Sequence, residues 1–302
     1  MQTVGLGLPH AERFFSSDSP CGLFREQVTN PVAQATLLSS LPRCLTGEAA
    51  AAGEGTAGDS LLSPDKLDWA LHRAWHGSAP GSDGLPYEFY HAFQERLIPV
   101  LQHVFNTALQ ATGDPEPMAR MLDGTICLLH KAGKPENELQ GFRPLTLLNA
   151  DVKLAMLVIS GRLQRPLEYL IDITQSAFLA GRDISDNVRY AQGIVARLNE
   201  LGLPAWMLQS DLTKAYDSVD HGWLEHVMRR MGFQEQGVIR WAQILLHGSV
   251  SRARVNGFLS PEFPVRSSLA RGLAVSCQEW LIVFQPLVSY LGRLASTGQL
   301  DP

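Results

Sequence analysis

Residues 207–217 read MLQSDLTKAYD, and the rest of the chain is best interpreted outward from them. The apolar start of this stretch predicts a short buried strand, Met207–Asp211, that ends in a carboxylate. A carboxylate at the exposed end of a buried strand suits Mg²⁺, which prefers hard oxygen donors, and the main-chain oxygen of Leu212 could supply a second ligand. Tyr216 follows where the chain is expected to turn into a helix, so its ring could form one wall of a pocket.

A second interpretation of the same stretch involves no metal. Asp211 then simply ends a strand, and Asp217 caps the following helix together with Asp220, since Asp is a favoured helix cap. Spacing alone does not separate these two alternatives.

The flanking sequence predicts a mixed α+β fold with helices and a few non-sequential strands. Helical periodicity appears at 64–76, from Phe89 to Leu109, and at 150–170, 186–201, 220–231, 236–247 and 277–295. A buried strand is expected at 125–131, and a hairpin at 251–259 is indicated by the Asn256-Gly257 turn.

The first 62 residues are expected to contribute little to the core. Residues 1–45 show no clear periodicity and are predicted to be irregular, and residues 47–59 have the composition of a flexible linker. Three glycines in it, Gly53, Gly55 and Gly58, match a dinucleotide-binding pattern literally, but no strand precedes them. We therefore expect no nucleotide site there.

Composition favours a soluble intracellular protein without a membrane partner. The 302 residues contain no apolar run long enough to span a bilayer and no signal-peptide pattern. The cysteines are widely spaced and are expected to be free thiols: Cys21, Cys44, Cys127 and Cys277. His72 and His76 are expected to form a surface pair rather than a metal site.

Charge is unevenly distributed along the chain, although the net charge is −5. Residues 1–142 carry 9 Lys/Arg and 16 Asp/Glu, whereas residues 143–302 carry 16 Lys/Arg and 14 Asp/Glu. The balance is thus −7 in the first part and +2 in the second. A nucleic-acid partner needs only a local basic track, so the second part is compatible with one.

Six ordered segments resemble the reverse transcriptases of LINE-type (non-LTR) retrotransposons. They share that family's order and separation, and together they cover about residues 78–287. The segments are SAPGSDGLP at 78–86, LLHKAGK at 128–134, FRPLTLLN at 142–149, QSAFLAGRDISDN at 175–187, DLTKAYD at 211–217 and VNGFLS at 255–260.

The resemblance implies a right-hand polymerase fold, with residues 63–150 as a fingers-like region, residues 151–302 as an incomplete palm, and the thumb absent. It implies that Asp211 is the catalytic, Mg²⁺-binding carboxylate, with Leu212 as the main-chain ligand. Tyr216 matches the aromatic residue that excludes a 2′-OH. The remaining nucleotide-binding positions implied are Lys131, Arg143, Arg271 and Gly272.

Departures from the family pattern cluster at residues 270–280. Arg271, Ala274 and Cys277 replace the family's Gln, Pro and Pro, whereas Gly272 and Ser276 keep their positions. The sequence also lacks the family's Phe/Tyr-Ala-Asp-Asp hairpin, so the two-metal site would have only one of its carboxylates.

We therefore expect a fragment of an RNA-directed DNA polymerase that is inactive alone. In the intact family the partners are an RNA template, a DNA primer and deoxynucleoside triphosphates. The alternative is a non-catalytic remnant or nucleic-acid-binding module. A metal hydrolase of another class would need a second cluster of ligands, which the sequence does not contain.

Overall fold

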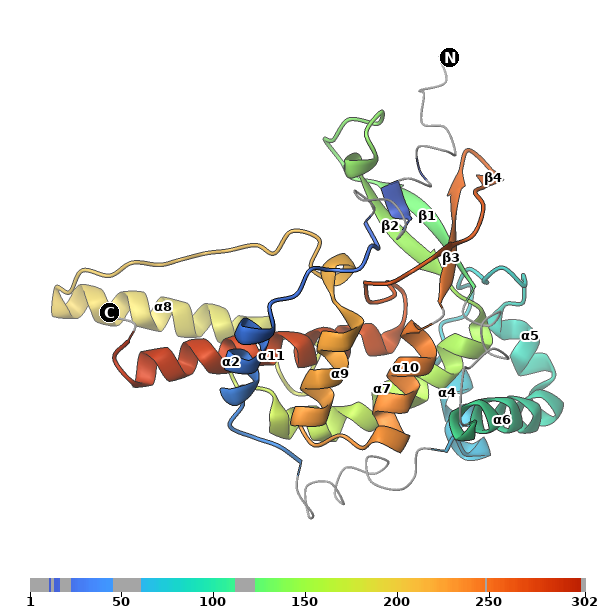
Figure 1. Cartoon of the computed structure of the whole chain (residues 1–302), viewed down its shortest axis with the longest axis horizontal. Helices are drawn as coiled ribbons and strands as arrows, with labels where there is room; N and C mark the ends of the chain where they lie inside the picture. The colour runs from blue at the N-terminus through green and yellow to red at the C-terminus, as the bar shows by residue number, and fades with distance from the viewer. Residues whose placement is uncertain are drawn as a thin grey trace.

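A mixed sheet lies at one end of the protein, shown in the upper part of Figure 1. The computed structural model describes residues 11, 14–16, 23–45, 61–111, 123–247 and 249–299. In these residues the sheet has five strands in the order β2-β1-β3-β4, and β5 pairs with β3. The strands are β1 (Gly124–His130), β2 (Phe142–Leu147), β3 (Val250–Val255), β4 (Phe258–Leu259) and β5 (Phe263–Pro264).

Strand β1 joins two parts of the chain that are distant in sequence. It runs antiparallel to β2 and parallel to β3, with Ile126 opposite Ala253. Ile126 and Ala253 are fully buried, and they pack with Phe15, Phe24 and other apolar residues from the N-terminal region. This small core covers one face of the sheet, so the N-terminal residues contribute to packing after all.

The predicted hairpin at 251–259 is confirmed. Residues of β3 and β4 pair antiparallel, with Val255 opposite Phe258. Both turn residues have positive φ, 51° at Asn256 and 86° at Gly257. Asn-Gly adopts this conformation at low cost, and its twist matches that of the strands.

Below the sheet, most of the main hydrophobic core comes from six of the described helices (Figure 1). They are α4 (Pro64–Arg73), α6 (Gln94–Gln110), α7 (Ala150–Leu170), α9 (His221–Arg230), α10 (Arg240–Leu246) and α11 (Ala274–Ser296). The long helices α7 and α11 pack against each other. Their buried faces include Leu154, Ile159 and Leu163 of α7 and Leu281 and Ile282 of α11.

Helix ends follow the expected capping chemistry. Ser63 accepts a hydrogen bond from the Lys66 N–H and Pro64 occupies the first turn of α4, as predicted. Asp220 accepts from the Trp223 N–H and caps α9. The helix predicted at 64–76 ends earlier, at Arg73, because Ala74 adopts an extended conformation. His76 therefore lies beyond the helix that carries His72, and both side chains are exposed.

Two other predictions of secondary structure are wrong. The long helix expected from Phe89 to Leu109 is two helices, α5 (Tyr87–Ala92) and α6, broken at Phe93, whose φ of −120° is not helical. The region 1–45 was predicted to be irregular, yet it contains α2 (Pro31–Ser39), which packs against α11. The Asn30 side chain caps α2 by accepting from the Val32 and Ala33 N–H groups. The predicted linker 47–59, with Gly53, Gly55 and Gly58, lies outside the described residues.

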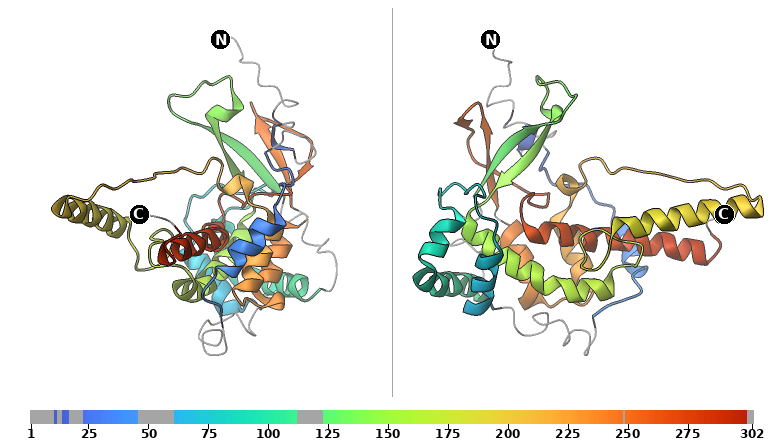
Figure 2. Two further views of the ribbon diagram at one scale, coloured as in Figure 1. Left: turned by 60° about the vertical axis from the view of Figure 1, so that its left-hand side comes forward. Right: turned by 180° about the vertical axis from the view of Figure 1, so that it is seen from behind.

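The largest correction concerns the strand predicted at Met207–Asp211. Residues 203–212 are extended but form no strand, because no other described strand lies beside them to pair with their N–H and C=O groups. Trp206 and Leu208 are 101% and 94% exposed. Helix α8 (Ile184–Leu201) precedes this segment and has no buried residue. Together α8 and residues 203–212 form an arm that projects from the body (Figures 1 and 2).

Among the described residues, no helix is both long enough and apolar enough to cross a membrane.

Candidate functional site

Two of the motif segments, 78–86 and 142–149, meet at the base of the sheet, where α7 begins. Lys153 donates from Nζ to the Ala79 carbonyl at 3.0 Å, and the Asn149 carboxamide oxygen accepts from the Ser82 hydroxyl and the Asp83 N–H, each at 3.4 Å. Gly81 lies so close to this strand-helix junction that a Cβ would be 2.6 Å from the Leu148 carbonyl carbon. Only glycine allows this approach.

Buried ionisable groups accompany this contact. Burial raises the pKa of the Asp151 carboxyl to about 6, and the nearby Asp83 carboxylate acts in the same direction. Burial lowers the pKa of the Lys153 ammonium. The Tyr90 hydroxyl is also shifted, since burial and the charges of Asp151 and Asp83 all raise its pKa. This junction is thus a partly buried polar contact that fixes the 78–86 loop on α7.

A group of charged residues lies around Asp217, which we call the Asp217 cluster: Asp217, Arg271, Lys131 and Lys214. Asp217 is buried, and its carboxylate accepts from the Arg271 guanidinium at 2.6 Å. Burial raises the pKa of the Asp217 carboxyl, whereas the charges of Arg271, Lys214 and Lys131 oppose that rise. The prediction that Asp217 caps a helix is therefore wrong. It sits in the short 3-10 turn Tyr216–Ser218 and pairs with a residue 54 positions away.

Main-chain hydrogen bonds clamp this turn to the loop before α11. The Leu269 N–H donates to the Tyr216 carbonyl at 3.0 Å, and the Ser268 N–H donates to the Val219 carbonyl at 2.9 Å. The Ser267 hydroxyl donates to the Asp217 carbonyl at 3.3 Å. Ser268 has a φ of +104°, an unusual value for a residue with a side chain, so the surrounding bonds hold a strained conformation.

Tyr216 begins a row of three stacked aromatic rings. Its ring centroid lies 5.7 Å from that of Trp280, which lies 5.6 Å from that of Phe284, with nearly parallel planes in both pairs. Burial raises the pKa of the Tyr216 hydroxyl. Trp280 and Phe284 were not predicted as site residues, although their i, i+4 spacing in a predicted helix indicates that the two rings are neighbours. Lys214 was not predicted as a member of the Asp217 cluster either.

Lys131 and Arg143 lie at neighbouring ends of the first two strands but are not equivalent. Lys131 follows β1, donates from Nζ to the Gln140 carbonyl at 2.9 Å, and is close enough to Asp217 to lower the pKa of that carboxyl. Arg143 is exposed on β2, where it is paired with Leu129 across the ladder. Of the two, Lys131 alone has an interaction with the Asp217 cluster among the described residues.

Gly272 follows Arg271 and packs against β2. Its φ is +118°, and a Cβ at this position would lie 3.0 Å from the Thr146 carbonyl oxygen. A side chain would therefore be strained by its backbone and crowded by the strand. The structure thus brings Tyr216, Arg271, Gly272 and Lys131 into one region beside the sheet.

Asp211 and Leu212 do not join that region. Asp211 is exposed on the arm, and no hydrogen bond or ion pair of its carboxylate occurs with the described residues. Leu212 lines a groove that also includes Trp223 and Trp280. The part of the chain that the structure describes contains no group of three or more His, Cys, Asp or Glu side chains able to hold a metal ion. As arranged here, the residues around Asp211 do not fit a Mg²⁺ ion.

Comparison with known proteins gives the family. The profile described as "Reverse transcriptase (RNA-dependent DNA polymerase)" matches residues 129–293, which include the end of β1, the Asp217 cluster and most of α11. The chain belongs to the reverse transcriptase family. The predicted resemblance to reverse transcriptases of non-LTR retrotransposons is thereby confirmed, together with a mixed α+β architecture.

One relative supports the retrotransposon origin. The chain is 28% identical over 235 residues to the "Transposon TX1 uncharacterized 149 kDa protein" of Xenopus laevis. The match covers 78% of this chain and 18% of that protein. The chain therefore spans less than a fifth of its relative, so it is similar to one portion of a much longer polypeptide.

Proposed function

We propose that this chain carries the nucleotide-binding part of a reverse transcriptase, with residues 63–150 as fingers and residues 151–302 as part of the palm. The sheet and the loop before α11 then surround the incoming deoxynucleoside triphosphate. An RNA template and a DNA primer are the expected macromolecular partners, and the first 62 residues, including α2, lie outside these two regions.

The Asp217 cluster is the observation that carries this proposal. Arg271, Lys131 and Lys214 supply three positive charges, whereas Asp217 supplies one negative charge. The excess of two positive charges favours an anionic ligand, and phosphate oxygens match guanidinium and ammonium donors. In this proposal Lys131 and Arg271 contact the triphosphate, and the close packing of Gly272 sets the position of Arg271. Arg143, exposed nearby on β2, reaches the outer phosphate.

Tyr216 would select the sugar. Its ring cannot move freely because Trp280 stacks on it and the Tyr216 carbonyl is bonded to the Leu269 N–H. A fixed ring beside the cationic cluster would clash with a 2′-OH and accept a deoxyribose. The row of rings continues through Phe284, and aromatic faces can also stack on nucleic-acid bases.

Metal-dependent chemistry needs an arrangement different from the present one. Reverse transcriptases generally use divalent metal ions, and Asp211 and Leu212 are the residues of this chain that match the family's metal site. Both lie on the exposed arm, and neither belongs to the Asp217 cluster. We therefore propose binding of nucleotide and nucleic acid, without polymerisation, for this chain by itself.

A nucleic-acid-binding module without nucleotide binding is the second candidate. It is favoured by the ion pair of Arg271, whose guanidinium is already engaged by Asp217 at 2.6 Å. If this pair does not open, Arg271 cannot hold a phosphate, and only the exposed basic and aromatic side chains remain available to a strand.

Equilibrium binding of fluorescent deoxynucleoside and ribonucleoside triphosphates to the 302-residue chain separates the candidates. We expect tighter binding of the deoxy form, at least tenfold weaker binding in Lys131→Met and Arg271→Met, and unchanged binding in the control Arg96→Met, an exposed position on α6. Tyr216→Ala should reduce the preference for the deoxy sugar. Binding of primed template without any nucleotide binding would support the second candidate and overturn the first.

A further inference from the structure

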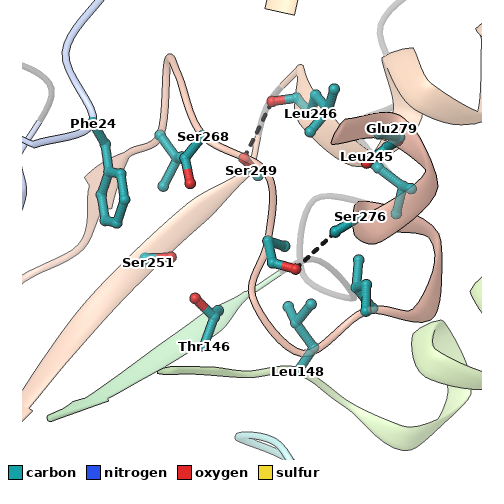
Figure 3. A pocket seen from close by; sticks show the side chains of 13 residues that line it. Phe24, Thr146, Leu148, Leu245, Leu246, Ser249, Ser251, Ser268, Ser276 and Glu279 are labelled. Carbon is teal, nitrogen blue, oxygen red and sulfur yellow. Dashed lines mark hydrogen bonds between the residues drawn. The ribbon is translucent and has the colours of Figure 1, made fainter. Parts of the chain in front are cut away.

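A small, partly enclosed cavity lies between the sheet, α10 and α11 (Figure 3). Its volume is about 40 Å³, enough for a small ion with a water molecule or for two to three waters. Thirteen residues line it, and none is Lys, Arg or His. The polar lining residues are one carboxylic acid and five hydroxyls: Glu279, Thr146, Ser249, Ser251, Ser268 and Ser276.

Glu279 is the unusual member of this wall. The side chain lies on the first turns of α11 and is 2% exposed. No hydrogen bond or ion pair of its carboxyl is found with any residue the structure describes. Burial alone raises the pKa of this carboxyl to about 7. An unpartnered ionised group is costly in such surroundings, so a ligand or a proton has to compensate it.

Three of the five hydroxyls around the cavity do not provide that compensation. Ser249 donates to the Leu246 carbonyl at 3.1 Å, Ser276 to the Ala270 carbonyl at 2.8 Å and Ser268 to the Leu269 carbonyl at 3.2 Å. Their protons are therefore directed at the main chain, and Figure 3 shows the first two of these bonds. The oxygen lone pairs of these three side chains remain as acceptors, and the Thr146 and Ser251 hydroxyls can accept as well.

We propose that this cavity is a binding site for a monovalent alkali cation. One carboxylate and one monovalent cation leave the site neutral, and neutral hydroxyl oxygens complete the coordination. A divalent ion would leave an uncompensated charge in a buried site and usually requires more carboxylates.

The site would stabilise the loop that positions Arg271. Ala270, Leu273 and Ser276 belong both to the cavity wall and to the segment from Ser268 to the first turn of α11. A bound cation would join this segment to β3 through Ser251 and to the end of α10 through Ser249. It is thus a structural ion, located beneath the proposed nucleotide site and separate from it.

Thermal unfolding of the 302-residue chain at pH 8 tests the proposal, with NaCl, KCl or choline chloride at equal ionic strength. We expect the unfolding midpoint in NaCl or KCl to exceed that in choline chloride. Once the ion concentration exceeds the dissociation constant of the site, the midpoint should rise by about 2 °C for each tenfold increase in that concentration. Glu279→Gln should abolish this ion dependence. Glu136→Gln, which removes an exposed carboxylate, should retain it.

Sodium-23 NMR provides an independent readout. Broadening of the sodium signal by the wild-type chain should be lost in Glu279→Gln and weakened in Ser251→Ala, which removes one wall oxygen and keeps the carboxylate. Equal midpoints in all three salts would overturn the proposal, because the cavity would then hold only water beside Glu279. Ion dependence that persists in Glu279→Gln would overturn it as well.

Discussion

The Arg271–Asp217 ion pair should be among the most sensitive points of the structure. The perturbation is Arg271→Met, which keeps much of the side-chain volume and removes the charge. The Asp217 side chain is 4% exposed, so its carboxylate would be left buried without its closest partner. Removing one member of a buried pair typically costs about 3–5 kcal/mol of unfolding free energy.

The expected value lies near the lower end, about 3 kcal/mol. Two features reduce the cost: the Arg271 side chain is still 29% exposed, and Lys131 and Lys214 also favour the ionised Asp217. Asp217→Leu should cost less, because the long Arg271 side chain can reach water. The double variant should cost less than Arg271→Met alone, since it leaves no unpaired buried charge.

Urea denaturation of the wild type, both single variants and the double variant gives the coupling free energy directly. Arg96→Met serves as the control for loss of an exposed arginine. The reasoning fails if Arg271→Met costs less than about 1 kcal/mol and the two changes are additive, because the pair would then behave like a solvent-exposed contact.

Four further predictions concern other parts of the molecule. In choline buffer the unfolding free energy should fall by about 3 kcal/mol between pH 4.5 and pH 7. Folding raises the pKa of Glu279 to about 7, so the unfolded chain ionises first and is favoured as the pH rises. The Glu279→Gln variant should lack this decrease. Gly81→Ala should destabilise by about 1–3 kcal/mol in urea, since its Cβ would meet the Leu148 main chain, and a neutral result would contradict the close packing described. Primer extension with primed template, nucleotides and Mg²⁺ should show no incorporation by this chain, whereas incorporation that disappears in Asp211→Ala would disprove this. Sedimentation should reveal self-association through the apolar side chains of the arm, residues 184–212, and a monodisperse monomer with sharp cooperative unfolding would refute it.

The sequence predicts correctly those helices and turns that are determined by short stretches of residues. The helix at 150–170 and the hairpin at Asn256-Gly257 were predicted within a residue or two, because amphipathic periodicity and turn chemistry are properties of short segments. The strand at Met207–Asp211 was not found, since a strand depends on a partner that its own residues do not specify. Residues in an apolar run therefore do not by themselves establish a strand.

The candidate site shows the same division. Tyr216, Arg271, Gly272 and Lys131 were named from the sequence, and the structure gathers them in one region. The ion pair between Asp217 and Arg271 could not be anticipated, because its members are 54 residues apart and the pairing depends on how the loop before α11 packs. The buried Glu279 could not be anticipated either, since the sequence gives no indication that an acidic residue early in a helix lines a cavity.

The parallel pairing of β1 with β3 has a consequence for the rate at which this protein folds. Residues 131–249, which include α7 to α10, separate these two strands in the sequence. The two strands can therefore pair only after this long intervening segment has become compact. Loop closure of this length precedes the contacts that stabilise it, and proteins rich in such contacts fold slowly. During refolding, the helices around α7 should acquire protection from hydrogen exchange first, and the amides of β3 should be protected only in the final phase.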